Sequence, residues 1–440
     1  MCYHFAKPLP LLLGIIFCCL VLGCSNSEGV DGTGWDDIIV SQDSDKLDYL
    51  PIDDSEYPYA GIPRVVIVTE NYQKIKDRET EIPAKLQIWG KKAPESEIMD
   101  LTIRGRGNTS WTNMPKKSYK IEFLKKQSML GMPKDKDWAL IANYADKTLM
   151  KNYLMNHLSA KLGAYYAPKC EFIELFLNRE YLGVYLLTET IKIAKHRINI
   201  PKNDSSYIVE LSRNSKPQDQ IIFVHGISND SAGAPFHVHH PKNTTKSNLN
   251  ALKKHLEDFE NFLKTISHSK NNDIAKWIDI NEFIKHYWVQ EFSKNPDASG
   301  YASIYLSWTT NDIIKMGPVW DFDLAFGSHS IEKNNQAENW YIKHGFWHPY
   351  IFKDSIVNQS RINFWREHEQ IFINITNTAD SLGSVLQKAA QNNFKRWDIL
   401  QKTEFIYHRH AYKSYTEAIE DLKNWIFQRI EWIDKEFNTI

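Results

Sequence analysis

Hydrophobic residues recur with two different spacings along the chain. From residue 60 to about 212, short apolar runs alternate with polar positions, which is typical of half-buried strands. Beyond about residue 245 the spacing is that of helices, apart from a hairpin expected at 302–308 and 313–319. The expected strands are 65–68, 84–89, 101–103, 118–123, 172–177, 181–188 and 207–211, and the expected helices are 146–162, 249–263, 283–292, 364–375, 382–394 and 415–437. We therefore expect an α+β protein with a strand-rich lobe (60–212) and a helix-rich lobe (245–440) within one domain over 60–440.

The first residues form a separate apolar segment. Leu9–Leu22 is almost wholly apolar but shorter than the ~20 residues that cross a bilayer, so residues 1–23 are expected to be a cleaved signal peptide. A glycine directly before Cys24 is typical of lipoprotein processing, which predicts a lipid on Cys24 and a bacterial envelope location, at the outer membrane or on its periplasmic or surface face. A plain secretory signal is the alternative. Residues 24–59, rich in Asp, Ser and Gly, are expected to be a flexible tether.

The net charge and the cysteine count limit the kinds of partner and site that the chain can have. The formal net charge is −1, and removal of the signal peptide takes away Lys7 alone, leaving −2. A net charge this close to zero argues against nucleic acid as a partner. Contact with the membrane is expected through the lipid only. Cys170 is the one cysteine of five beyond Cys24, which excludes a disulfide framework and a cysteine-rich zinc site.

Polar side chains flank both ends of the expected hairpin. Asn295 and Asp297 come before its first strand, and Asp321 and Asp323 follow its second strand. Because a hairpin returns the chain to where it began, these side chains are expected to lie together. Mg²⁺ prefers oxygen ligands and is commonly held by one or two carboxylates plus substrate phosphates, so Asp321, Asn295 and Asp323 are the candidate metal ligands. The alternative is that the acids cap helices or turns.

Candidate cations for phosphate lie in the strand-rich half. Arg106 stands in a glycine-containing turn, and Lys117 and Lys120 follow it on an expected strand. Alternate residues of a strand face opposite sides, so these two lysines cannot both point inward. The glycines complete neither the Gly-rich kinase loop nor the Walker pattern, and exposed strand lysines are more often solvent charges.

Together these segments resemble the spore coat protein H (CotH) kinase family. The matching stretches, in unbroken order, are Arg104–Trp111, Pro115–Phe123, Leu140–Asn152, Phe176–Glu189, Lys294–Asp297 and Gly317–Gly327. The resemblance implies a bilobal, atypical protein-kinase-like fold. It also implies that ATP and Mg²⁺ (or Mn²⁺) are used to phosphorylate Ser or Thr of secreted or surface proteins.

Position by position, the resemblance assigns roles to single residues. Asp321 corresponds to the metal-binding acid, Asp297 to the catalytic-loop acid and Lys117 to the phosphate-contacting lysine, with Asn295 and Glu189 as further candidates. Two positions depart from the family pattern: Ser307 follows Leu306 where a basic residue is expected, and Ser328 follows Gly327 where Asn is usual. A pseudokinase is therefore an alternative.

Other kinds of function stay open at this point. The 14 tryptophans suit a non-catalytic surface lipoprotein that binds glycan or protein through aromatic faces. Two of the carboxylates could instead serve an acid/base hydrolase without nucleotide. His237 and His239 share a strand face with the spacing of a transition-metal site, but the sequence offers no nearby acid or cysteine to complete it, and His344 and His348 read as part of an aromatic-rich loop.

Overall fold

The structure is a computed structural model, and it describes residues 55–91, 95–214, 219–228, 230–266, 273–328, 335–405, 407–408 and 410–438. All of these belong to one unit of the chain, Asp48–Ile440. The expected signal peptide, the lipidated Cys24 and the tether as far as residue 54 lie outside the described residues, so those expectations stay predictions.

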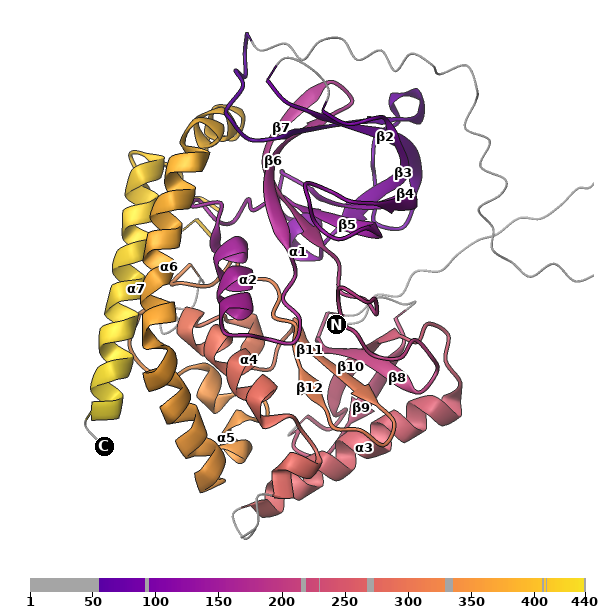
Figure 1. The fold of residues 1–440 in the computed structure, drawn as a ribbon, viewed down its shortest axis with the longest axis vertical. Coiled ribbons are helices and arrows are strands. Elements are labelled where there is room, and N and C mark those ends of the chain that lie inside the picture. The colour runs from indigo at the N-terminus through magenta and orange to yellow at the C-terminus, as the bar shows by residue number, and fades with distance from the viewer. Residues whose placement is uncertain are drawn as a thin grey trace, which may run out of the picture. The chain divides into compact units, whose positions relative to one another are not determined.

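Seven strands of the N-terminal half close into a barrel (Figure 1). In order around the barrel they are β1 (Arg64–Thr69), β2 (Ile82–Trp89), β3 (Met99–Arg106), β4 (Ser118–Gln127), β5 (Asp135–Ile141), β7 (Glu180–Glu189) and β6 (Cys170–Leu177). β1 and β6 pair in parallel and close the barrel, whereas the other neighbours are antiparallel. Alternate side chains such as Ile67, Leu86 and Ile121 are fully buried inside. The alternation seen in the sequence is therefore that of a barrel wall.

Strand β5 was missed by the sequence analysis because its first residues are charged. Asp135 and Asp137 begin the strand, and Lys192 lies 3.1 Å from Asp135 and also pairs with Asp137. Lys120, on the adjacent strand, lies 3.0 Å from Asp137. Ion pairs with neighbouring segments thus allow a strand where the local polarity suggested a loop.

A second sheet takes its strands from both halves of the chain. Its order is β12 (Lys315–Met316), β11 (Ile304–Thr309), β8 (Ser206–Leu211), β10 (Ala234–His240) and β9 (Ile221–Val224). The expected hairpin is present as β11 and β12, although β12 is shorter than predicted. β8, which the sequence analysis placed in the strand-rich lobe, is instead the central strand of this second sheet, antiparallel to β10 and β11.

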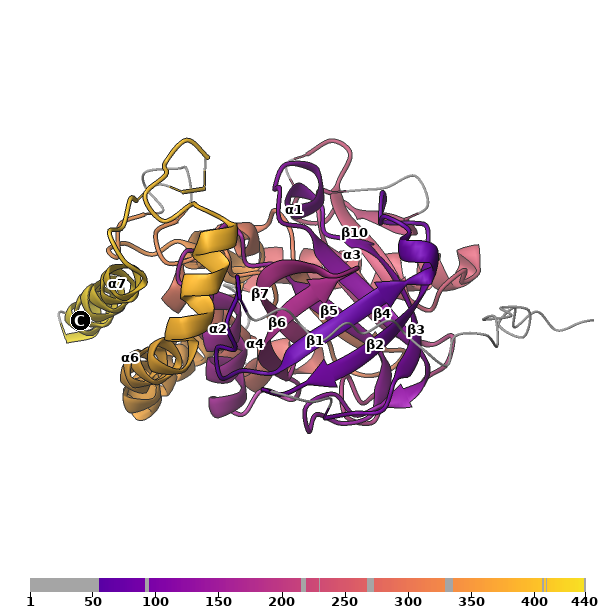
Figure 2. The same ribbon diagram turned by 90° about the horizontal axis from the view of Figure 1, so that it is seen from above.

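Helices pack around these sheets. They are α1 (Thr109–Thr112), α2 (Lys151–Lys161), α3 (Lys246–Thr265), α4 (Ile280–Ser293), α5 (His348–Ile351), α6 (Ser355–Arg396) and α7 (Tyr415–Asn438), with 3-10 turns η1 (Glu70–Tyr72), η3 (Asp273–Lys276), η4 (Asp297–Ser299) and η6 (Ile342–His344). α6 and α7 lie side by side along one flank, as both ribbon views show (Figures 1 and 2). The α+β class and the order of a strand-rich region before a helix-rich region are thus confirmed. The closed barrel was not anticipated.

Helix α6 is one continuous helix of 42 residues where the sequence predicted two. Thr and Ser residues stand between the two predicted helices, and such residues favour caps and turns. In the structure their hydroxyls bond back to the preceding turn instead: Thr376 donates to the carbonyl of Ile373 at 2.8 Å and Ser381 to that of Asn377 at 2.9 Å. The helix therefore continues, and its close contact with α7 leaves no room for a side chain at Gly383, where a Cβ would lie 2.6 Å from Ile419.

The end of α6 is fixed to the barrel by buried polar contacts. The side-chain amide oxygen of Asn393 accepts a hydrogen bond from the Lys116 ammonium at 2.9 Å and from the backbone N–H of Val184, in β7, at 3.1 Å. Lys116 is fully buried, and burial holds its pKa well below the usual lysine value. Lys116 thus joins the barrel to the helical region rather than facing a ligand.

Candidate active site

A cavity of about 450 Å³ lies between the barrel and the second sheet. One wall consists of the turn after β3 and the corner between β5 and α2, and the other consists of β8, β10 and β11. Segments far apart in the sequence meet here, and the cavity contains the acids that the sequence singled out. Asp297, Asp321 and Asp323 all line it, whereas Asn295 stands just behind it.

Burial and mutual repulsion raise the pKa values of these acids. Burial, followed by the charges of Asp321 and Glu210, raises the pKa of Asp297 to about 7. Burial also raises the pKa of Asp321, against the lowering effect of Arg106, and it raises that of Asp323 well above the usual range, helped by Asp321. Carboxyl groups crowded in this way are costly to ionise unless a cation joins them. The cluster therefore has electrostatics that favour binding of either protons or a cation.

The donor set fits a hard cation that keeps part of its own hydration. Among the described residues, no three His, Cys, Asp or Glu side chains are arranged as a complete metal site. The available ligands are carboxylate oxygens together with the side-chain oxygen of Asn295, which is buried and has no hydrogen-bond partner among the residues that the structure describes. Mg²⁺ is usually held in this way, by one or two carboxylates with water and substrate phosphates completing its shell.

The loops that carry the acids are fixed by unusual backbone geometry. Helix α4 ends at Lys294, whose φ of 46° turns the chain toward Asp297. Asp321 has a φ of 67°, in the left-handed region that side chains other than glycine rarely adopt. The N–H of Phe322 donates to Asn152 of α2 at 2.8 Å, which holds the Asp-Phe-Asp segment against the barrel side of the cavity. Strained residues held by such contacts are typical of functional sites.

One cation faces the acids across the cavity. The guanidinium carbon of Arg106 lies 4.9 Å from the ring centre of Trp320. Burial lowers the pKa of Arg106, while the charges of Tyr305, Asp321 and Glu210 act in the opposite direction. No hydrogen bond to this guanidinium occurs among the described residues. A half-buried, planar cation stacked on an aromatic ring with its donors unused is suited to bind a phosphate group.

The family match agrees with this geometry. The family of CotH kinase proteins matches residues 103–433, which are most of the chain and include all of the residues that line the cavity. The chain belongs to the CotH kinase family. No curated protein matches the sequence closely enough to add a relative.

In this CotH kinase chain, the predicted lysines are not at the cavity. Lys117 donates to the backbone carbonyl of Trp111 and lies 5.6 Å from its ring centre, and burial slightly lowers its pKa. Lys120 is 2.7 Å from Glu122 and 3.0 Å from Asp137. Ser118, at the start of β4, is the one residue of this strand that lines the cavity. The charge of Lys120, two residues farther along the strand, is neutralised by Glu122 and Asp137.

Glu189 also lies away from the cavity. Its carboxylate accepts hydrogen bonds from the N–H of Lys169 at 3.0 Å and from the hydroxyl of Tyr166 at 3.3 Å, and Arg197 is 3.9 Å away. Burial raises the pKa of Glu189 despite these partners. Its neighbours belong to a structural network at the end of β7, so the expected nucleotide contact has no support in its position.

Sequence reasoning missed two groups near the acids. Lys151, in the first turn of α2, donates to the carbonyl of Ala325 at 2.9 Å and to the hydroxyl of Ser328, and the charge of Asp323 opposes the lowering of its pKa by burial. Glu210 of β8 also lines the cavity. No short-range signal marks either residue, because their partners are distant in the sequence.

The histidine pair also differs from expectation, because acids do lie beside it. Nδ1 of His237 is 3.3 Å from Asp219, and Nε2 of His239 is 2.7 Å from Glu210. All four side chains line the same cavity as the aspartates. The segment before β9 and the strand β8 supply these carboxylates, which the linear sequence could not place there.

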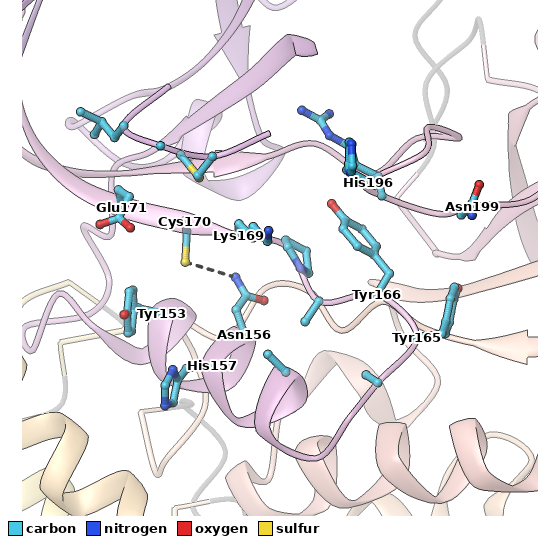
Figure 3. Close-up of a pocket in the computed structure, with 18 of the residues that line it drawn as sticks. Tyr153, Asn156, His157, Tyr165, Tyr166, Lys169, Cys170, Glu171, His196 and Asn199 are labelled. Atoms are coloured by element: carbon cyan, nitrogen blue, oxygen red, sulfur yellow. Dashed lines mark hydrogen bonds between the residues drawn. The ribbon is translucent and has the colours of Figure 1, made fainter. Parts of the chain in front are cut away.

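A larger hollow of about 680 Å³ lies beside α2 and the start of β6 (Figure 3). Asn156 and Cys170 contact each other there at 3.9 Å, and burial raises the pKa of the Cys170 thiol to about 12. A thiol that stays protonated is a poor nucleophile. The smaller cavity, with its opposed acids and arginine, is therefore the candidate active site.

Proposed function

We propose that this chain is an atypical kinase that transfers the terminal phosphoryl group of ATP to Ser or Thr hydroxyls of envelope or extracellular proteins. The observation that carries the proposal is the meeting of Asp297, Asp321 and Asp323 with Arg106 in one cavity. Phosphoryl transfer needs positioned charges rather than covalent chemistry by the protein, and these four residues supply them.

Each residue has a distinct role in this proposal. Asp321 and Asp323, with Asn295 behind them, would hold Mg²⁺ or Mn²⁺, which would neutralise charge on the phosphates. Arg106 binds phosphate oxygens through its free guanidinium. Asp297 accepts the proton of the attacking hydroxyl, since a base whose pKa lies near 7 is well matched to neutral conditions.

The cellular setting belongs to the same proposal. A signal peptide ending before Cys24 supports export and lipid attachment, and no helix in the described part of the chain is long and apolar enough to span a bilayer. Membrane contact would then be through the lipid alone, with a protein bearing Ser or Thr and a nucleotide as the partners.

Transfer of label tests the proposal directly. The purified full chain would be incubated with labelled ATP, Mg²⁺ or Mn²⁺ and a Ser/Thr-rich protein, beside Asp321→Asn and a matched control, Asp312→Asn, in the exposed turn of the same hairpin. We expect metal-dependent labelling that Asp321→Asn abolishes and Asp312→Asn retains. Thermal stabilisation by Mg-ATP without any transfer would instead identify a pseudokinase.

A further inference from the structure

The wall of the cavity opposite Arg106 contains a polar group without a partner. His237 stands on β10 and is 5% exposed, and its Nε2 is buried with no hydrogen-bond partner in the part of the chain that the structure describes. Its other ring nitrogen, Nδ1, lies 3.3 Å from a carboxylate oxygen of Asp219. Buried polar atoms are satisfied in most folded proteins, so one without a partner on a residue that lines a cavity is a candidate for contact with a ligand.

The carboxylate beside Nδ1 decides what Nε2 can do. The Asp219 carboxylate lies 3.3 Å from Nδ1, so the tautomer with its proton on Nδ1 places that N–H toward a carboxylate and has Nε2 as its hydrogen-bond acceptor. The neighbouring pair differs in this respect: Nε2 of His239 already contacts Glu210 at 2.7 Å, and Glu210 also accepts from the N–H of Ser303 at 3.2 Å. Of these two histidines, both of which line the cavity, only His237 therefore has a ring nitrogen without a partner among the described residues.

The group that suits this acceptor is a donor brought in by a ligand. Acids line the cavity around it, including Glu210 and Asp297, so an anionic group would be repelled on this side. A neutral hydroxyl can donate to Nε2 without adding charge. The phosphates of a nucleotide would be drawn instead to Arg106 on the opposite wall.

We propose that His237, oriented by Asp219, is the hydroxyl-binding residue of the cavity. The proposal rests on the proposed kinase function, which supplies two sources of a hydroxyl: the Ser or Thr of the protein acceptor and the ribose of the nucleotide. Both share the same donor chemistry. His237 would fix the hydroxyl by one hydrogen bond, and its loss is expected to cost roughly tenfold in the affected constant.

Two variants of His237 test the roles of its two ring nitrogens separately. His237→Asn retains a donor for Asp219 but removes the acceptor at the Nε2 position, whereas His237→Gln can place an amide oxygen near that position. His225→Gln, on an exposed histidine after β9, is the matched control. We expect His237→Asn to lose roughly tenfold, His237→Gln to lose less, and His225→Gln to behave as the wild type.

The readouts distinguish the two hydroxyls. Transfer to a Ser/Thr-rich protein gives kcat/KM for the acceptor, and binding of Mg-ATP is compared with binding of 2′,3′-dideoxy-ATP. A loss in acceptor kcat/KM with unchanged nucleotide affinity assigns the protein hydroxyl. A loss of affinity for ATP but not for the dideoxy nucleotide assigns the ribose.

The outcomes also distinguish failure of the His237 assignment from failure of the proposed kinase function. Wild-type protein that neither binds Mg-ATP nor transfers label overturns the kinase proposal, and the assignment of His237 with it. Wild-type protein that transfers label while His237→Asn matches it in every readout overturns the assignment of His237 alone. If His237→Asn does not fold, His237→Met, which fills the ring volume without an acceptor nitrogen, carries the same expectations.

Discussion

The side-chain amide of Asn295 donates a hydrogen bond to the backbone carbonyl of Asp321 at 3.0 Å, across the ends of the hairpin. A second bond, to Gln290 of α4 at 3.0 Å, fixes the same amide to the end of the helix. The segment that carries Asp297 and the segment that carries Asp321 are thus tied together through one buried residue. The position of Asp321 depends on Asn295 in addition to its own strained backbone.

Replacement of Asn295 by alanine should therefore weaken both the fold and the site. Loss of the two hydrogen bonds leaves the buried side-chain oxygen of Gln290 unpaired, which is expected to cost about 1–3 kcal/mol of unfolding free energy. Mn²⁺ affinity should fall as well, because the loop that carries Asp321 is released. Urea unfolding and Mn²⁺ titration measure the two effects. Unchanged Mn²⁺ affinity in a folded variant would remove Asn295 from the site.

The metal-free site should lower the stability of the protein at neutral and alkaline pH. Because the folded-state pKa of Asp297 is raised from 3.8 to about 7, the folded protein binds the proton more tightly than the unfolded chain does. The stability linked to Asp297 is thus present below about pH 3.8 and is lost as the pH rises toward 7.

Asp297→Asn should for this reason melt at a higher temperature than the wild type at pH 8 in the presence of EDTA. At pH 4 the two proteins should melt close together. Mg²⁺ with ATP should stabilise the wild type and not Asp321→Asn. Thermal melts at the two pH values, with and without Mg-ATP, make the comparison, and a variant that is less stable at pH 8 would contradict the proposed charge repulsion.

Arg106 and Lys117 should respond differently to substitution. Arg106→Lys keeps the charge but loses the planar pair of donors and the stacking on Trp320, so Mg-ATP affinity is expected to fall by roughly tenfold or more. Lys117→Ala should leave that affinity unchanged, because Lys117 is occupied by Trp111 outside the cavity. Calorimetric titration with Mg-ATP would decide. Weakened binding in Lys117→Ala would restore the role that the family resemblance assigned to it.

Buried histidines should destabilise the protein in mild acid. Burial lowers the pKa of His286 to about 3, and lowers the pKa values of His348 and His408 to about 4. The unfolded chain binds protons near pH 6.5 and the folded protein does not, so stability is present above that pH and falls below it. Each group contributes up to about 1.4 kcal/mol per pH unit.

His408→Gln isolates one of these contributions. His408 contacts the backbone carbonyl of Tyr144 at 2.7 Å, and the glutamine amide can donate in its place. Urea unfolding at pH 7 and pH 5 should show a smaller loss of stability in the variant than in the wild type. Equal losses in both proteins would show that His408 does not resist protonation.

Much of the secondary structure could be predicted because it depends on neighbouring residues. Periodic apolar positions identified β1 to β4, the β6–β7 hairpin, α3, α4 and α7, and the hairpin argument brought Asp297 and Asp321 to one place. The argument failed where a distant partner decided the local structure, as for the charged start of β5 and the Thr- and Ser-containing middle of α6.

The sequence by itself determined the α+β class, the family and the acids of the candidate site, since these depend on local periodicity and on the short loop between two paired strands. Only the tertiary structure decided that the strands close into a barrel and that Arg106, rather than Lys117, faces the acids. It also decided that Asp219 and Glu210 stand beside the two histidines. Those features depend on which surfaces pack together and on which charges are neutralised by neighbouring residues. The spacing of residues along the sequence predicts neither the packing nor the ion pairs.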